Sequence, residues 1–308
     1  MLSPEILRQI KMLELRAGRA VTDVMAGQYV STFKGRGMEF DEVREYIPGD
    51  EVRLIDWNVT ARLGTPHIKI LREERELTMI IVCDVSASQS FQGFHRPKRD
   101  VAAEMAAVMA FLASRSQDRV GLVLASDQIE EYTPPRKGRG HVWRMIREVL
   151  TYQARGRGTD LDKTLRFVDQ VQKRRALIFV LSDFLDATPR DAAPKHKNEN
   201  KSGHSFSSAL GLLARRHDVV AVRICDPQER RAPAESGMVE IADAESGTRV
   251  VVDTSNKVFQ REFSRWWTDH DASFGAWVRR SGARTFDVST AGNTVKPLAD
   301  FLAGGAQR

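Results

Sequence analysis

The stretch at residues 77–88 reads LTMIIVCDVSAS, an apolar run that ends in an aspartate followed by two alternating serines. Continuous apolar runs of this length are typical of strands that are buried on both faces of a parallel sheet. Open α/β sheets bind ligands beyond the carboxyl ends of their strands, and Asp84, Ser86 and Ser88 occupy such an end. The stretch therefore predicts both a core strand and a ligand site.

The residue types at this strand end favour a hard cation. A carboxylate and two hydroxyls offer only oxygen ligands, which suit Mg²⁺ or Mn²⁺, with Ca²⁺ as a further alternative, and serve soft transition metals poorly. Thr159 follows a glycine-rich turn at residues 155–158, and Asp183 ends a second apolar run at residues 176–182. We predict that these residues complete one metal site, formed by Asp84, Ser86, Ser88, Thr159 and Asp183.

A purely structural role for the same residues is the alternative. Serine and threonine are common helix N-caps, and residues 159–162, Thr-Asp-Leu-Asp, also fit a capping box. In that case the two aspartates would be ordinary loop residues. The order of all five residues along the chain, each at an expected element end, favours the metal site.

The rest of the sequence predicts a doubly wound, mostly parallel α/β sheet, because apolar strand patterns alternate with helical ones. Expected strands lie at residues 77–83, 120–124, 129–132, 176–182, 219–224 and 285–288, and expected helices at 97–116, 141–152, 160–173 and 205–216. A hairpin at 237–253, a long helix containing three tryptophans and a last helix follow.

Three parts are expected along the chain. Residues 1–30 form an N-terminal helical segment that begins with Ser3 and Pro4 as helix-start signals, and residues 31–76 form a small β-rich subdomain with turns at Pro48-Gly49. Residues 77–308 form the main domain. We expect the hairpin at 237–253 to join the small subdomain.

Composition limits the function classes. The 308 residues are 42% hydrophobic, enough for one large domain and a small one, and two isolated cysteines suggest no disulfide framework. The formal net charge is +6, but basic and acidic residues alternate, as at residues 72–76, which argues against nucleic acid as a partner. Charges interrupt any signal-peptide or membrane-spanning core, so we expect a cytoplasmic chain without a membrane span.

The motif order D-x-S-x-S, then threonine, then aspartate resembles the metal-ion-dependent adhesion site of von Willebrand factor A domains. That resemblance implies that Ser86, Ser88 and Thr159 ligate the ion directly, whereas Asp84 and Asp183 mostly hold its waters. It also implies an open coordination position that a partner's carboxylate can fill.

A second segment carries a more specific resemblance. Residues 35–46, GRGMEFDEVREY, followed by Pro-Gly-Asp at 48–50, Ile-Asp-Trp at 55–57 and Ala-Arg at 61–62, resemble the domain of unknown function 58 family, which joins such a segment to a von Willebrand A-like sheet. Members are commonly encoded beside MoxR-type AAA+ ATPases. The resemblance therefore implies an adaptor or co-chaperone that works with a MoxR-type ATPase on an unidentified client.

An enzyme is the competing function, because a strand-end aspartate with Mg²⁺ is also found in aspartate-nucleophile phosphatases and other hydrolases. Haloacid-dehalogenase-like enzymes carry a second aspartate where this chain has Ser86, and no phosphate-binding G-x-x-x-x-G-K-[ST] loop is present. We therefore expect a non-catalytic adaptor.

Two surface regions are each compatible with two roles. The charges between Arg44 and Arg62, beside Phe40, Tyr46 and Trp57, fit either an interface with the main sheet or a docking surface for the ATPase. The polar segment at 189–203, which follows Asp183, fits either an idle insertion or a specificity loop.

Overall fold

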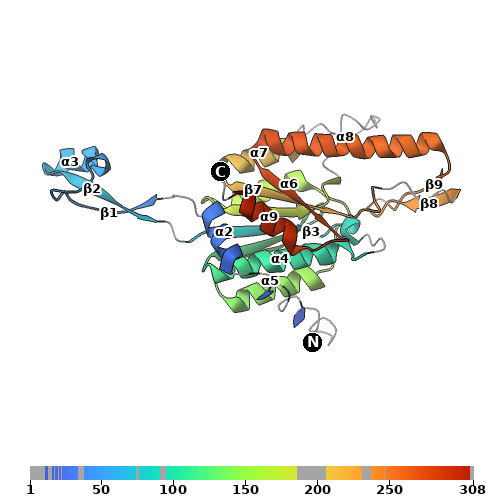
Figure 1. The fold of residues 1–308 in the computed structure, drawn as a ribbon, viewed down its shortest axis with the longest axis horizontal. Coiled ribbons are helices and arrows are strands. Elements are labelled where there is room, and N and C mark those ends of the chain that lie inside the picture. Colours follow the sequence, from blue (N-terminus) through green and yellow to red (C-terminus); the bar gives the residue numbers. More distant parts are fainter. Residues whose placement is uncertain are drawn as a thin grey trace.

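The computed structural model describes residues 11–12, 16, 18–19, 21, 23–33, 38–73, 76–90, 95–185, 206–230, 237–245 and 247–305. Within these residues, six strands form a central sheet in the order β10-β7-β6-β3-β4-β5 (Figure 1). The strands are β3 (Thr78–Asp84), β4 (Arg119–Ala125), β5 (Ile129–Arg136), β6 (Leu177–Ser182), β7 (Asp218–Cys225) and β10 (Arg284–Ser289). Only β5 in this sheet is antiparallel to its neighbour.

The order of the strands creates a switch point between β3 and β6. From β3 the chain proceeds to β4 on one side, and it later returns to β6 on the other side. Crevices for ligands open at such reversals, beyond the carboxyl ends of the two strands. The predicted doubly wound, mostly parallel sheet is confirmed, and its switch point is where Asp84 and Asp183 lie.

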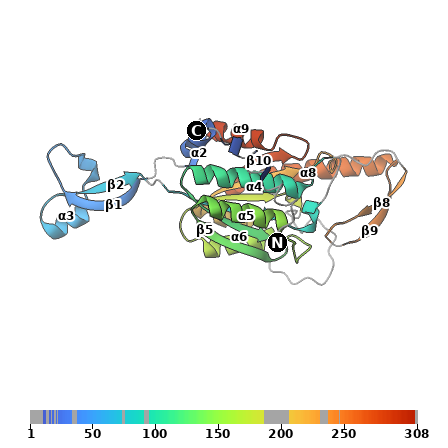
Figure 2. The same cartoon turned by 90° about the horizontal axis from the view of Figure 1, so that it is seen from below.

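Helices cover both faces of the sheet (Figures 1 and 2). Met79, Ile81 and Cys83 of β3 pack in one core with four helices, whereas Ile80 and Val82 pack in a second core with three others. The first group is α2 (Asp23–Phe33), α4 (Lys98–Arg115), α5 (Arg139–Thr151) and α9 (Val295–Gly305); the second is α6 (Leu161–Val171), α7 (Phe206–Arg216) and α8 (Lys257–Ser281). This burial explains the unbroken apolar run of β3.

The expected strands and helices of the main sheet match the observed ones to within a few residues, with one informative difference. β5 continues through Pro134 and Pro135 to Arg136, although the expected strand ended at residue 132. Proline lacks the N–H that a central strand must donate, but an edge strand needs hydrogen bonds on one side only. As the outermost strand beside β4, β5 tolerates both prolines.

The N-terminal helical segment differs from the expectation. Most of the predicted helix that starts at Ser3 lies outside the described residues, and the structure instead shows α2 at Asp23–Phe33. Tyr29 and Phe33 are buried, and the Phe33 ring lies 6.0 Å from that of Phe179 and 6.4 Å from that of Phe301. The helix is therefore part of the main core, where it packs beside α9.

The small subdomain consists of β1 (Met38–Glu45), the 3₁₀ turn η1 (Val52–Leu54), α3 (Trp57–Leu63) and β2 (His67–Glu73). β1 and β2 form a two-stranded antiparallel sheet of their own. The hairpin of β8 (Met238–Ala242) and β9 (Arg249–Asp253) forms a third separate sheet. The prediction that this hairpin joins the subdomain is wrong, because both views place the two at opposite ends of the molecule (Figures 1 and 2).

Among the described helices, none is both long enough and apolar enough to cross a bilayer.

A buried arginine connects β7, β10 and α8. Arg223 donates two hydrogen bonds to Asp287, at 3.0 and 2.6 Å, and one to Asp271 at 2.6 Å. Its guanidinium carbon also lies 4.6 Å from the ring centroid of Phe274.

We predict that Arg223→Ala lowers the free energy of unfolding by about 2 kcal/mol, because Asp287 then loses both hydrogen bonds from Arg223 and Asp271 keeps only Arg230 as an arginine partner, in a partly desolvated place. Urea denaturation measures the loss. The matched control is Arg175→Ala, since Arg175 pairs with Asp218 at the surface with 76% of its side chain exposed, and that change should cost less than about 1 kcal/mol. Equal losses of stability in the two variants would contradict the stabilising role of Arg223.

Candidate metal site at the switch point

Asp84 is a buried carboxylate held by short-range hydrogen bonds. Its Oδ1 accepts the backbone N–H of Ser86 at 2.9 Å, and its Oδ2 accepts the hydroxyl of Ser182 at 2.7 Å. Burial, and secondly the nearby charge of Asp183, raise the pKa of Asp84 from 3.8 to about 7 against these hydrogen bonds. An ionised Asp84 therefore lacks sufficient compensating positive charge in the protein alone.

The two serines after β3 are side by side. Ser86 is buried, Ser88 lies in the 3₁₀ turn η2 (Ala87–Ser90), and their hydroxyl oxygens are 3.0 Å apart. Adjacent ligands of an octahedral Mg²⁺ at about 2.0–2.1 Å are separated by about 2.9 Å. The separation of the two hydroxyls is therefore suitable for joint ligation of one small cation.

Thr159 is not the helix cap that the capping-box alternative required. Asp160 is the N-cap of α6, and its side chain accepts the N–H of Lys163 at 2.9 Å. The hydroxyl of Thr159 instead donates to Oε1 of Glu245 at 2.7 Å, across 86 positions of sequence. Thr159 is thus available for a role in the site, and its contact shows that the β8–β9 hairpin reaches it.

The loop before Thr159 is fixed to its surroundings. The carboxylate of Glu130 accepts the N–H groups of Arg155 and Gly156 at 3.0 and 2.8 Å, and the carbonyl of Arg157 accepts the N–H of Ala87 at 3.0 Å. A Cβ on Gly156 would lie 1.9 Å from Oδ1 of Asp127 and 2.4 Å from the hydroxyl of Ser126, so a larger residue would have to displace these two side chains. The hydrogen bond between Ala87 and Arg157 joins the Thr159 loop to the loop that carries Ser86 and Ser88.

Asp183 has a partner that the sequence reasoning missed. Lys98, at the start of α4, is fully buried and its Nζ lies 2.6 Å from Oδ2 of Asp183 and 2.6 Å from Oε1 of Glu229. Burial alone would lower the pKa of Lys98, but the two carboxylates outweigh burial and the pKa is raised. Lys98 therefore stays charged and holds one oxygen of Asp183.

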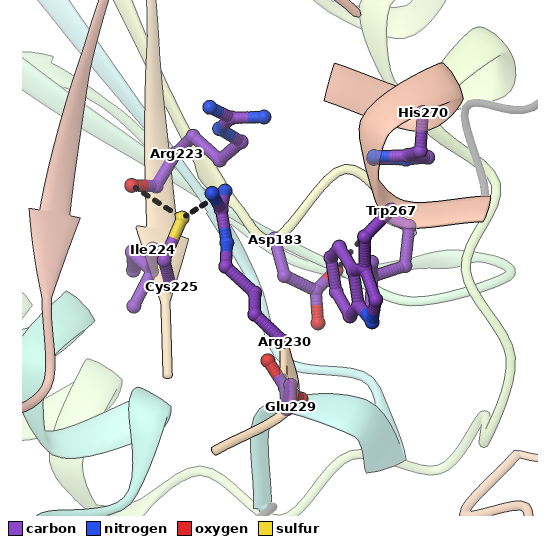
Figure 3. A pocket seen from close by; sticks show the side chains of 9 residues that line it. Asp183, Arg223, Ile224, Cys225, Glu229, Arg230, Trp267 and His270 are labelled. Atoms are coloured by element: carbon purple, nitrogen blue, oxygen red, sulfur yellow. Dashed lines mark hydrogen bonds between the residues drawn. The ribbon is translucent and has the colours of Figure 1, made fainter. Parts of the chain in front are cut away.

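Asp183 also lines a small cavity (Figure 3). Asp183 Oδ1 accepts the N–H of Leu185 at 3.3 Å, and the cavity beside it measures about 10 Å³, the volume of about one water molecule. Its other walls include Arg230, Trp267 and His270, and the Arg230 guanidinium lies 5.6 Å from the centre of a Trp267 ring. The cavity is too small for an organic ligand.

The geometry fits a small hard cation held mostly by hydroxyls and waters. No three His, Cys, Asp or Glu side chains gather as a metal cluster in the part of the chain that the structure describes, so a carboxylate-rich or zinc-type site is not built there. What the switch point offers is the Ser86–Ser88 hydroxyl pair, the Thr159 hydroxyl and two buried carboxylates that repel each other. Mg²⁺ is the ion that such a donor set suits best.

The structure thus brings the five predicted residues to one edge of the sheet, through two groups of contacts. Asp84, Ser86 and Ser88 are joined by hydrogen bonds to one another or to the same loop, and Asp183 follows Ser182, which bonds Asp84. Thr159 is connected through its loop and through Glu245. Lys98, Glu229 and Glu245 were missed because they come from other elements, and no local pattern marks them.

Residues 42–273 match the family described as protein of unknown function DUF58. The chain belongs to this family. Uncharacterized proteins of Mycobacterium bovis and Mycobacterium tuberculosis are 30% identical to it over 303 residues, which covers 97% of this chain and 90% of each relative.

Solved structures resemble the chain more distantly. BatB from Bacteroides thetaiotaomicron is 14% identical, with a TM-score of 0.46 and coverage of 75% of this chain and 100% of that one. The VWA domain of SpRpn10 is 10% identical, with a TM-score of 0.33 and coverage of 73% and 94%. The family membership predicted from residues 35–62 is confirmed by the sequence match.

We predict that Asp84→Asn stabilises the metal-free protein at pH 8. A raised carboxyl pKa means that the native state binds the proton more tightly than the unfolded chain, so stability decreases as the pH rises from about 4 to 7. The amide removes this loss, which amounts to at most about 4 kcal/mol. Urea unfolding in EDTA at pH 5 and pH 8 measures it.

Asp162→Asn is the control for this prediction, because Asp162 pairs with Arg166 on the surface of α6 and its loss should change stability by less than about 1 kcal/mol. If Asp84→Asn is instead less stable than the parent at pH 8, the protein itself compensates the Asp84 charge.

Proposed function

We propose that this chain is a metal-dependent protein-interaction adaptor, in which Mg²⁺ held at the switch point binds an acidic side chain of a partner. The observation that carries the proposal is the pair of serine hydroxyls 3.0 Å apart beside the buried, under-compensated carboxylate of Asp84. When bound, the ion would supply a positive centre that attracts a partner's carboxylate. Ser86, Ser88 and Thr159 would hold it directly, with Asp84 and Asp183 orienting its waters.

A MoxR-type AAA+ ATPase is the partner that we propose, because members of this family are commonly encoded beside such ATPases. The chain itself offers no phosphate-binding loop, so the work of ATP hydrolysis would belong to that partner. In this arrangement the chain connects the ATPase to a client protein, as an adaptor or co-chaperone does.

The small subdomain supplies a second surface for such a role. Ile47, Val52, Trp57 and Leu63 are all at least 60% exposed there, and large exposed apolar side chains that gather on one unit favour protein contact. The charges of this segment pair locally: Arg44 bonds Asp50 at 2.8 and 2.7 Å, and Asp56 caps α3. These bonds stabilise the subdomain itself and leave its apolar residues for a partner.

The hydrolase alternative has less support. Both oxygens of Asp84 accept hydrogen bonds from the protein, which makes the carboxylate a poor nucleophile, and Ser86 stands where a second acidic catalyst would be needed. Phosphatase turnover by the purified chain that disappears in Asp84→Asn would favour the enzyme instead.

We predict that isolated protein binds Mg²⁺ or Mn²⁺ weakly and that Ser86→Ala abolishes binding, because three neutral hydroxyls neutralise little of the ion's charge. Isothermal titration calorimetry measures the affinity. Ser264→Ala on α8, whose hydroxyl bonds the carbonyl of Gln260 away from the switch point, is the control and should bind normally. Unchanged affinity in Ser86→Ala would refute the site.

We further predict that Thr159→Ala weakens binding of the ATPase without unfolding the chain, since the hydroxyl caps no helix and its one hydrogen bond contributes about 1 kcal/mol. Surface plasmon resonance with the purified ATPase, in Mg²⁺ and in EDTA, provides the measurement. If the affinity is the same in Mg²⁺, in EDTA and in the variant, contact is made elsewhere, and residues 40–62 become the next segment to change.

A further inference from the structure

The tip of the β8–β9 hairpin places a carboxylate against the candidate metal site. Glu245 accepts the hydroxyl of Thr159 at 2.7 Å, and a Cβ on Gly158 would lie 3.7 Å from its other oxygen. Among residues 241–245, Glu245 alone is partly buried, whereas the other four are exposed. The hairpin therefore contacts the body at its tip through this side chain.

The rest of the hairpin is weakly attached. β8 and β9 pair only with each other in the part of the chain that is described, and Met238, Val250 and Val251 are each more than 50% exposed. At its base, Thr254 is buried and donates to the carbonyl of Gly237 at 2.9 Å, both through its N–H and through its hydroxyl. An element with a firm base and few buried contacts can swing at low cost.

The distance between the Glu245 carboxylate and the Thr159 hydroxyl is suitable for joint ligation of one cation. Two oxygens 2.7 Å apart are close to the spacing of neighbouring ligands around a small octahedral cation, about 2.9 Å. The same hydroxyl is one of the predicted direct ligands.

We propose that Glu245 is an internal ligand of the site, which occupies the coordination position that a partner's acidic side chain takes. This inference rests on the proposed function and adds a regulatory step to it. With the hairpin docked, the ion is held closed by the chain's own carboxylate. A partner must displace the hairpin tip and exchange one carboxylate for another, so that Glu245 sets the threshold for binding.

Mn²⁺ alone is the probe that tests this proposal, because its effect on water relaxation reports how many waters it binds directly. We expect Glu245→Ala to weaken Mn²⁺ binding about tenfold, since a charged ligand is lost, and to admit one more water to the bound ion. Glu245→Gln keeps an oxygen ligand without the charge and should lie between the parent and Glu245→Ala.

Glu240→Ala is the matched control. Glu240 lies on β8 of the same hairpin, pairs with Arg249 at 3.4 Å and is 53% exposed, so its removal should change neither affinity nor water count. Hydrogen exchange gives a second readout: Mg²⁺ should slow exchange of the Glu245 and Gly247 amides in the parent and in Glu240→Ala, but not in Glu245→Ala.

The outcomes separate this inference from the proposed function. If the parent binds Mn²⁺, Ser86→Ala does not, and Glu245→Ala binds with the same affinity and water count as the parent, the site stands and the internal ligand is wrong. If the parent fails to bind Mn²⁺, or binds it equally well in Ser86→Ala, both proposals are overturned.

Discussion

One carboxylate at the end of a strand buried on both faces constrains the structure around it. Asp84 cannot be moved away from the core, because the six preceding residues of its strand lie between two layers of helices. Its charge must therefore be compensated where it stands. The hydroxyl of Ser182 and the N–H of Ser86 supply part of the compensation, and Lys98 is already committed to Asp183 and Glu229. The rest would come either from protonation, which the raised pKa of Asp84 favours, or from the divalent ion that we propose.

The fold, and the gathering of the five candidate residues at one edge of the sheet, could be predicted from the sequence because both depend on local patterns. The apolar runs that become β3 and β6 must end at the same edge of a parallel sheet, and the polar residues after them are brought together by that geometry alone. Thr159 lies beside this group of residues, and the N-cap of α6 is Asp160 rather than Thr159.

What could not be predicted depends on contacts between distant side chains. No periodicity marks Lys98 as buried, since lysine at the first turn of a helix is ordinarily solvated, and nothing near Glu245 in the sequence shows that it meets Thr159. The placement of the hairpin failed for a related reason. Strand pairing between separate hairpins is decided by how the chain between them runs, and here the whole main sheet lies between β1–β2 and β8–β9.

Glu130 connects the candidate metal site to β5, an edge strand of the sheet. It belongs to β5, the outermost strand, yet its carboxylate accepts the backbone N–H groups of Arg155 and Gly156. Burial alone would raise the pKa of Glu130, but the hydrogen bonds that it accepts outweigh burial and lower the pKa to about 2. The position of the Thr159 hydroxyl therefore depends on an edge strand rather than on the strands that carry Asp84 and Asp183. Fraying of β5 would weaken binding of the ion that we propose while the core remained intact, so the affinity for that ion would depend on how well this edge strand is ordered.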